Sequence, residues 1–178
     1  MNKGDKLGLY LYHFDSRMFH KAVEFFSTSL EIDNDDIPIK IDIVDNIGRG
    51  RTAGTCAPDF DEDFKIKKID IQIKYSTTTI GMIEALAHEM VHAKQWIKGE
   101  LSVEVSKYRL FGILPVRKFK KLWNGKDISS LSYYEQPPEK EAHFMQRYMV
   151  HLFLDCAKEK IYPTTMAVLL DETDSIIN

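Results

Sequence analysis

Alternation of apolar and polar positions predicts two strands in the first half of the chain. Isoleucine occupies every second position of residues 37–43, and the same alternation returns over residues 69–74. A period of two places successive side chains on opposite faces, as in a strand that buries one face. Between these strands, the glycine-rich segment 48–54 predicts a hairpin turn or a short strand that crosses near a site.

Apolar residues at helical spacing predict three helices, which we place at residues 15–30, 79–98 and 139–160. Gly99 follows the second helix as a C-terminal cap, because glycine readily adopts the left-handed conformation that ends a helix. Two prolines, beginning at Pro137, precede the third helix and mark its start. The chain therefore combines a small sheet with three helices.

The segment between the second and third helices, residues 101–136, contains two glycines, one proline and a basic cluster. We interpret it as an insertion or loop region with one or two short helices. The whole pattern predicts an α+β fold in a single domain over residues 1–178. In this fold a small twisted sheet packs on the second helix, and the third helix lies beside it.

Composition and charge exclude several classes of protein. The 178-residue chain is 44% hydrophobic and 29% charged, and its net charge of −3 gives no global attraction for nucleic acid. No stretch approaches the roughly 20 apolar residues that span a bilayer, and the N-terminus has no signal-peptide pattern. The two cysteines lie far apart and form no CxxC pair. We therefore expect free thiols and a cytoplasmic protein without membrane contact.

An HExxH motif occupies residues 88–92 in the middle of the second predicted helix. Positions i and i+4 lie about 40° apart around a helix, so His88 and His92 project from one face and can bind one metal ion. Glu89 lies beside the first histidine, where its carboxylate can take a proton from an attacking water. The strand directly before this helix could offer a backbone edge to an extended peptide. The motif thus predicts Zn²⁺ as cofactor, His88 and His92 as ligands, and Glu89 as general base.

A catalytic zinc site has three protein ligands and an open position, so a third ligand is required. No cysteine lies near the motif, which argues against a closed structural site. The candidates are Glu139, Glu141 and His143, at the start of the third predicted helix. Glu139 and Glu141 are about 200° apart around the helix axis, so only one can face the metal, and periodicity does not decide between them. His143 lies one turn beyond Glu139 on the same face.

These motifs resemble those of known metallopeptidases. HExxH followed by a helix that opens with Glu-x-x-Ala, here residues 139–142, is similar to the gluzincin pattern, in which that glutamate is the third zinc ligand. Residues 51–56, 69–71 and 88–93 resemble the minimal zincin core of SprT-like proteins. The region 37–155 resembles small phage and bacterial metallopeptidases, including the ImmA/IrrE type. The resemblance implies a minimal zincin fold, with zinc held by the two histidines and that glutamate.

The chain departs from these families in the residues around the third ligand. SprT-like proteins use a third histidine, and no histidine lies between His92 and His143 in this chain. Proteins of the ImmA/IrrE type usually have asparagine after the alanine, where this chain has His143. We therefore rank Glu139 first as the third ligand, and keep His143 and Glu141 as alternatives.

A basic segment, residues 105–126, contains no acidic residue and several interleaved aromatic residues. Such a pattern can bind single-stranded nucleic acid, but a solvated insertion is the simpler interpretation in an acidic protein. Its basic residues are Lys107, Arg109, Arg117, Lys118, Lys120, Lys121 and Lys126.

Taken together, the motifs predict a zinc metallopeptidase that hydrolyses peptide bonds in a peptide or protein substrate. The alternative is a non-catalytic, zinc-containing binding or regulatory protein, associated with nucleic acid through the basic segment. Such a protein would need the ligands but would have no use for Glu89.

Overall fold

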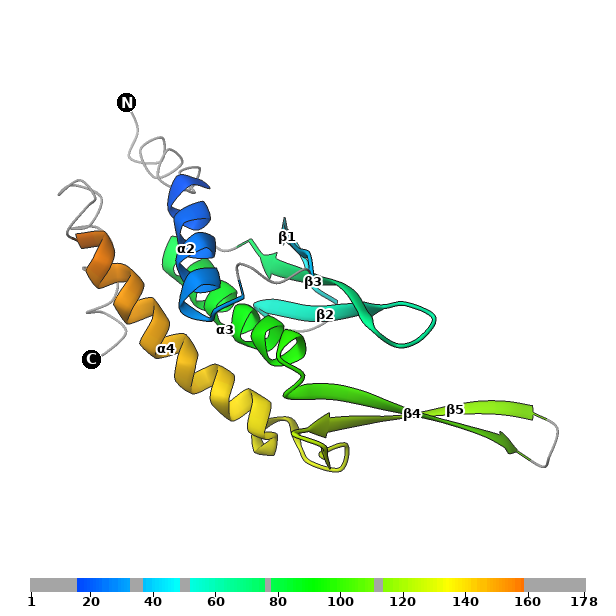
Figure 1. Ribbon diagram of the computed structural model, residues 1–178. Coiled ribbons are helices and arrows are strands. Elements are labelled where there is room, and N and C mark those ends of the chain that lie inside the picture. Colours follow the sequence, from blue (N-terminus) through cyan, green and yellow to red (C-terminus); the bar gives the residue numbers. More distant parts are fainter. Residues whose placement is uncertain (1–15, 33–36, 49–51, 76–77, 111–113, 159–178) are drawn as a thin grey trace.

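A computed structural model of the protein describes residues 16–32, 37–48, 52–75, 78–110 and 114–158. This part of the chain has the predicted α+β class, with three α-helices, one short 3-10 helix and two three-stranded sheets (Figure 1). None of the helices in these ranges is long and apolar enough to cross a membrane. The two cysteines are free thiols, as predicted.

The first sheet contains both predicted strands and a third one. Strands β1 (Ile39–Val44) and β3 (Ile66–Lys74) correspond to the two isoleucine-rich segments and pair in parallel. Strand β2 (Gly54–Phe60) pairs with β3 in antiparallel orientation, so the strand order is β1-β3-β2. Alternate isoleucines of the central strand β3 are fully buried, because they face the core. They are Ile69, Ile71 and Ile73.

The strand directly before the HExxH helix does not offer a free edge, so that part of the sequence interpretation was wrong. β3 has a hydrogen-bonded neighbour on each side and cannot pair with a further peptide. The edge strand that packs on the helix is β2, which begins at Gly54, the last residue of the glycine-rich segment. Pro58 fits in β2 because an edge strand forms ladder hydrogen bonds on one side only.

Helix α3 (Thr79–Ile97) carries the HExxH motif and is buried on almost every side. Thr78 caps its N-terminus by accepting a hydrogen bond from the backbone N–H of Gly81 at 3.2 Å. The helix packs against the first sheet on one side and against α2 (Ser16–Ser29) and α4 (Pro137–Lys158) on the other (Figure 1). Close packing of this kind restricts side-chain motion, which favours a well-defined site.

Most of residues 101–127 form a second sheet, so the prediction of a loop was wrong there, whereas one short helix does occur, at residues 133–135. Strands β4 (Leu101–Leu110) and β5 (Leu114–Trp123) make a long antiparallel hairpin that projects from the body of the protein (Figure 1). Strand β6 (Lys126–Asp127) pairs with the end of β5. The 3-10 helix η1 (Tyr133–Glu135) then leads directly into α4.

The sequence carries two signals for this second sheet, one in β4 and one in the turn between β5 and β6. Leu101, Val103 and Val105 alternate with polar residues, which is the period of a strand. Asn124 and Gly125 have φ values of +46° and +76°, and they form the two-residue turn between β5 and β6. An Asn-Gly pair is a strong signal for this kind of turn. Both signals were outweighed by the glycines and basic residues of the segment, which are typical of a solvated loop.

Part of the basic segment is engaged within the fold. Nζ of Lys120 lies 3.7 Å from a carboxylate oxygen of Glu104, and Nζ of Lys121 donates to Oε1 of Gln136 at 2.9 Å. These contacts are consistent with a solvated strand pair. Binding of nucleic acid by this segment stays a prediction.

Gly99 allows the first prediction about stability, because it ends α3 with a φ of +71°. A Cβ atom at this position would meet nothing within 4 Å, so a larger residue would suffer only backbone strain. Gly99→Ala should lower the free energy of unfolding by about 1 kcal/mol, measured by chemical denaturation. Gly99→Asn is the matched control and should cost less, since asparagine tolerates this conformation better. Equal stabilities of the wild type and Gly99→Ala would contradict this account.

Candidate metal centre

Two histidines project from the same face of α3. His88 and His92 are one helical turn apart, and their Nε2 atoms lie 3.2 Å from each other. Their rings meet edge to face with centroids 4.8 Å apart, and both side chains are buried. The two nitrogens therefore converge on one point within the protein.

A carboxylate from α4 completes this group. Glu139 lies in the first turn of α4, and its Oε2 atom is 3.5 Å from Nε2 of His88 and 3.3 Å from Nε2 of His92. The residue is only 5% exposed, and Oε2 has no hydrogen bond of acceptable geometry within the part of the chain that the structure describes. A buried carboxylate oxygen without a donor is costly. The site therefore favours a cation in contact with this atom.

The three ligand atoms have the spacing that a four-coordinate metal ion requires. Ligands bound about 2.0–2.1 Å from a tetrahedral zinc ion lie about 3.3 Å from one another. The observed distances are 3.2, 3.3 and 3.5 Å. His88, His92 and Glu139 could thus hold a metal ion.

A glutamine holds the second nitrogen of each imidazole ring. Nδ1 of His92 donates to Oε1 of Gln95 at 2.8 Å, and Nδ1 of His88 donates to Oε1 of Gln146 at 3.2 Å. An amide oxygen can only accept, so each Nδ1 carries the proton. Each Nε2 then keeps its lone pair for a cation, and both rings are fixed in orientation.

The neighbours of Glu139 keep its carboxylate ionised. Burial alone would raise the pKa of Glu139, but the adjacent His88, His92 and Tyr133 side chains hold this pKa well below the ordinary carboxyl value. Burial lowers the pKa of His92, whereas Glu139 and Gln95 raise it, and the net shift is upward. Burial and the hydrogen bond to Glu139 raise the pKa of the Tyr133 hydroxyl. Glu139 is therefore present in the charged form that binds a metal ion.

Glu89 lies beside the ligands and against the backbone of β2. It is 6% exposed; burial raises its pKa, the two histidines lower it and Glu139 raises it, with a net upward shift. Gly54 permits the Glu89 side chain to lie close to the β2 backbone. A Cβ atom at residue 54 would lie only 2.7 Å from Cγ and 2.8 Å from Oε1 of Glu89. Burial and the Glu89 carboxylate also raise the pKa of the Cys56 thiol, which lies further along β2. A carboxylate with a raised pKa is better suited to proton transfer near neutral pH.

The two alternative third ligands make other contacts. Glu141 lies 3.1 Å from Nζ of Lys94 and accepts a hydrogen bond from Nε2 of Gln95 at 3.2 Å, so it joins the start of α4 to the end of α3. His143 is exposed, and its ring centroid is 4.6 Å from that of His88. Burial and the neighbouring His88 lower the pKa of His143. Neither residue belongs to the group that converges with the histidines.

Sequence reasoning did not single out three residues of the site. Gln95 lies about one turn after His92, and Gln146 lies two turns after Glu139, so helical periodicity could have placed both near the ligands. The contact between Gly54 and Glu89 joins a strand to a helix, and no pattern within either element predicts it.

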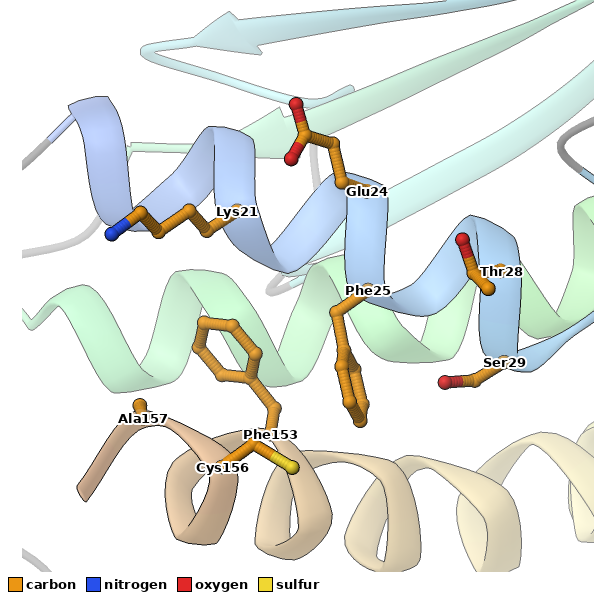
Figure 2. A pocket seen from close by; sticks show the side chains of 8 residues that line it. All are labelled: Lys21, Glu24, Phe25, Thr28, Ser29, Phe153, Cys156 and Ala157. Atoms are coloured by element: carbon orange, nitrogen blue, oxygen red, sulfur yellow. The ribbon is translucent and has the colours of Figure 1, made fainter. Parts of the chain in front are cut away.

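A separate cavity of about 450 Å³ lies between α2 and α4 (Figure 2). Phe25 from α2 and Phe153 from α4 point into it, with ring centroids 5.6 Å apart, while Lys21 and Glu24 extend away from the two rings. No residue of the candidate metal centre lines this cavity, so it adds nothing to the chemistry of that centre. The rest of its lining consists of Thr28, Ser29, Cys156 and Ala157.

Comparisons with known proteins do not extend this description. No family model matches the chain, and neither the curated proteins nor the solved structures give a match. The functional argument therefore depends on the geometry of the site.

The third ligand can be tested by comparing two neighbouring glutamates. Glu139→Ala should weaken binding of Zn²⁺ by more than the about 10–100-fold typical of losing an outer hydrogen bond, because it removes a ligand. Glu141→Ala should keep most of the affinity and lower the thermal stability, since Lys94 and Gln95 lose a partner. Competition with a chelator measures both affinities. If Glu141→Ala were the damaging change and Glu139→Ala were silent, the orientation of α4 described above would be wrong.

Proposed function

We propose that this protein is a zinc-dependent peptidase that hydrolyses peptide bonds. The observation that carries the proposal is the convergence of His88, His92 and Glu139 on one point, with Glu89 buried beside them. Three protein ligands and an open position are typical of catalytic zinc, whereas structural zinc is enclosed by four ligands, often cysteines. Neither cysteine belongs to the converging group.

The distances between the ligand atoms favour zinc over an octahedral metal. Two histidines and one carboxylate can also hold non-haem iron, on one face of an octahedron. At bond lengths of about 2.1 Å, octahedral neighbours would lie about 3.0 Å apart, against about 3.4 Å for tetrahedral neighbours. The distances of 3.2, 3.3 and 3.5 Å support the tetrahedral arrangement.

Glu89 is the general base in this proposal. When bound, zinc supplies Lewis acidity: it lowers the pKa of water toward about 7 and polarises the scissile carbonyl. The Glu89 carboxylate accepts a proton from the attacking water as the water oxygen bonds to the carbonyl carbon. The protonated Glu89 then gives this proton to the amine nitrogen that leaves, which restores the carboxylate. Burial suits Glu89 to both steps, because its raised pKa helps it to hold the proton between them.

The edge strand β2 is the surface that we expect to receive the substrate. β2 pairs with β3 on one side, so its outer backbone groups can pair with an extended peptide. Its first residue, Gly54, touches Glu89, and a peptide added to this edge would therefore pass beside the general base. Backbone pairing of this kind depends weakly on side chains, and it supports a peptide or protein substrate.

The decisive experiment replaces Glu89 by glutamine. Glu89→Gln keeps the size of the side chain but cannot accept the proton at neutral pH. Bound zinc should stay at about one ion per chain, as in the wild type, because Glu89 is not a ligand. Turnover should fall by about 10²–10⁴-fold, the usual effect of losing a general base. Zinc content is measured by metal analysis and turnover by cleavage of a peptide library.

A chelator-treated wild type and a His88→Ala variant serve as controls that lack the metal. Equal cleavage by wild type and Glu89→Gln would rule out Glu89 as the base. If the zinc-loaded wild type cleaves nothing in the library or among candidate proteins, the non-catalytic zinc protein becomes the better description. Absence of zinc binding by the wild type would contradict both.

Gly54→Ala tests the position of Glu89 without changing any ionisable group. The new methyl group would overlap Glu89, so the carboxylate must shift. A displacement of about 1 Å in a catalytic group can cost about 10²-fold in rate, and we expect a loss of this order with zinc content unchanged. Ala57→Ser, at an exposed position of β2, is the matched control and should keep both activity and zinc. Full activity of Gly54→Ala would show that the contact is dispensable.

A further inference from the structure

Gln95 is a fully buried polar residue at the junction of α3 and α4. Its side chain has an exposed fraction of 0%. A buried amide must find partners for its oxygen and for both N–H groups, or it destabilises the fold. The identity of these partners therefore shows what the residue does.

The amide oxygen of Gln95 holds one metal ligand. Oε1 accepts a hydrogen bond from Nδ1 of His92 at 2.8 Å, and this is the shorter of the two hydrogen bonds to the histidine rings. It fixes the rotation of the His92 ring and leaves Nε2 free to bind a cation. Through this bond, Gln95 acts on the second histidine of the motif.

The amide nitrogen of Gln95 holds the helix that carries another ligand. Nε2 donates to the carbonyl oxygen of Pro138 at 3.0 Å and to Oε2 of Glu141 at 3.2 Å. The Pro138 carbonyl belongs to the peptide group that precedes the Cα atom of Glu139. This hydrogen bond therefore fixes the backbone from which the Glu139 side chain extends.

The orientation of the Gln95 amide cannot be reversed. A rotation by 180° would place its N–H groups against the Nδ1–H group of His92. It would also place its oxygen against the Pro138 carbonyl and the Glu141 carboxylate. All three contacts would become repulsive. The amide thus links the two halves of the site in one arrangement.

We propose that Gln95 is a positioning residue that sets the distance between the histidine pair and Glu139. This inference rests on the metal-dependent function proposed above. Gln95 does not touch the reacting atoms; it acts through His92 on α3 and through the first turn of α4. A ligand on a second helix must be held to within a few tenths of an ångström for tetrahedral coordination, and one buried amide supplies that restraint.

Gln146 provides the matched comparison within the same site. Its Oε1 atom also accepts a hydrogen bond from a ligand, from Nδ1 of His88, but this bond is longer, at 3.2 Å. Unlike Gln95, it lies on α4 itself, so its only bond described here joins it to α3 through the ring. Loss of Gln146 should free one ring, whereas loss of Gln95 should free a ring and the start of α4 together.

The test uses Co²⁺ as a spectroscopic probe of coordination geometry and needs no substrate. Gln95→Met keeps the approximate volume but removes all three hydrogen bonds. We expect its affinity for Co²⁺ to fall by about 10–100-fold, the usual effect of losing an outer hydrogen bond. At saturating Co²⁺, its visible absorption bands should be weaker and shifted, because Glu139 no longer meets the ion in tetrahedral geometry. Gln146→Met should bind Co²⁺ more weakly than wild type and keep the wild-type spectrum.

A merely structural role would give a different result. Gln95→Met would then melt at a lower temperature without metal, and its Co²⁺ affinity and spectrum would match those of wild type; this outcome overturns the proposal. If Gln95→Met fails to fold, Gln95→Glu replaces it. A glutamate can still accept from His92 but cannot donate to Pro138, so a wild-type spectrum from that variant would also overturn the proposal.

The same experiment separates this inference from the proposed function. A wild type that binds no Co²⁺ and no Zn²⁺ would remove the metal centre and, with it, the role of Gln95. A wild type that binds Co²⁺ in tetrahedral geometry but cleaves no peptide would weaken the peptidase proposal only. The spectra of Gln95→Met and Gln95→Glu would still decide the role of Gln95.

Discussion

The structure depends on one electrostatic constraint, the burial of a carboxylate against two imidazole rings. Each of these groups loses water on burial and must recover the lost interactions within the protein. Oxygen Oε2 of Glu139 has no hydrogen bond to the described residues, although the Nε2 atoms of both histidines lie 3.5 and 3.3 Å from it. The fold therefore brings a carboxylate oxygen and two imidazole nitrogens together at a point where a positive charge would be stabilised. A dication supplies this charge better than any protein group nearby.

The chain meets the constraint by bringing α4 back to α3 after a long excursion. Between the two helices it passes through the projecting hairpin of β4 and β5, and the base of this excursion is closed by several local contacts. The backbone N–H of Asn124 donates to the carbonyl of Glu100 at 2.7 Å, and Glu100 also pairs with Lys94 at the end of α3. Lys94 in turn reaches Glu141 on α4. These contacts hold the two ends of the excursion together beside the site.

Local pattern was enough to predict what lies on a single element. The spacing of His88 and His92 required only that α3 be a helix, and the isoleucine alternation required only that β1 and β3 be strands. The choice between Glu139 and Glu141 was different, because both flank the buried stripe of α4 at similar angles. The rotation of α4 about its own axis decides which of them faces the histidines, and the first turn of α4 contacts α3 through the Pro138 carbonyl and Gln95. Periodicity within one helix contains no information about such contacts.

Two of the features that sequence interpretation missed, the second sheet and the role of Gly54, have different causes. The second sheet was missed although the alternation of β4 and the Asn-Gly turn between β5 and β6 are both present in the sequence, because the glycines and lysines of this segment are also typical of loops. The role of Gly54 could not have been found in this way. The absence of a side chain at Gly54 matters only because Glu89 of α3 occupies the space where a Cβ atom would lie. This contact between β2 and α3 forms only in the folded protein.

The enclosure of α3 has a consequence for how the site opens. A helix packed on nearly all sides exchanges its amide hydrogens only when much of the protein unfolds, whereas a helix terminus can fray alone. His88 and His92 therefore belong to the slowest-opening part of the molecule, and Glu139 belongs to the first turn of a helix at its margin. Of the three ligands, Glu139 is then the one whose element can open without unfolding α3, so we expect loss of an ion to begin at that turn. The rate of ion exchange would be set by α4, while the equilibrium stability of the fold would be set elsewhere.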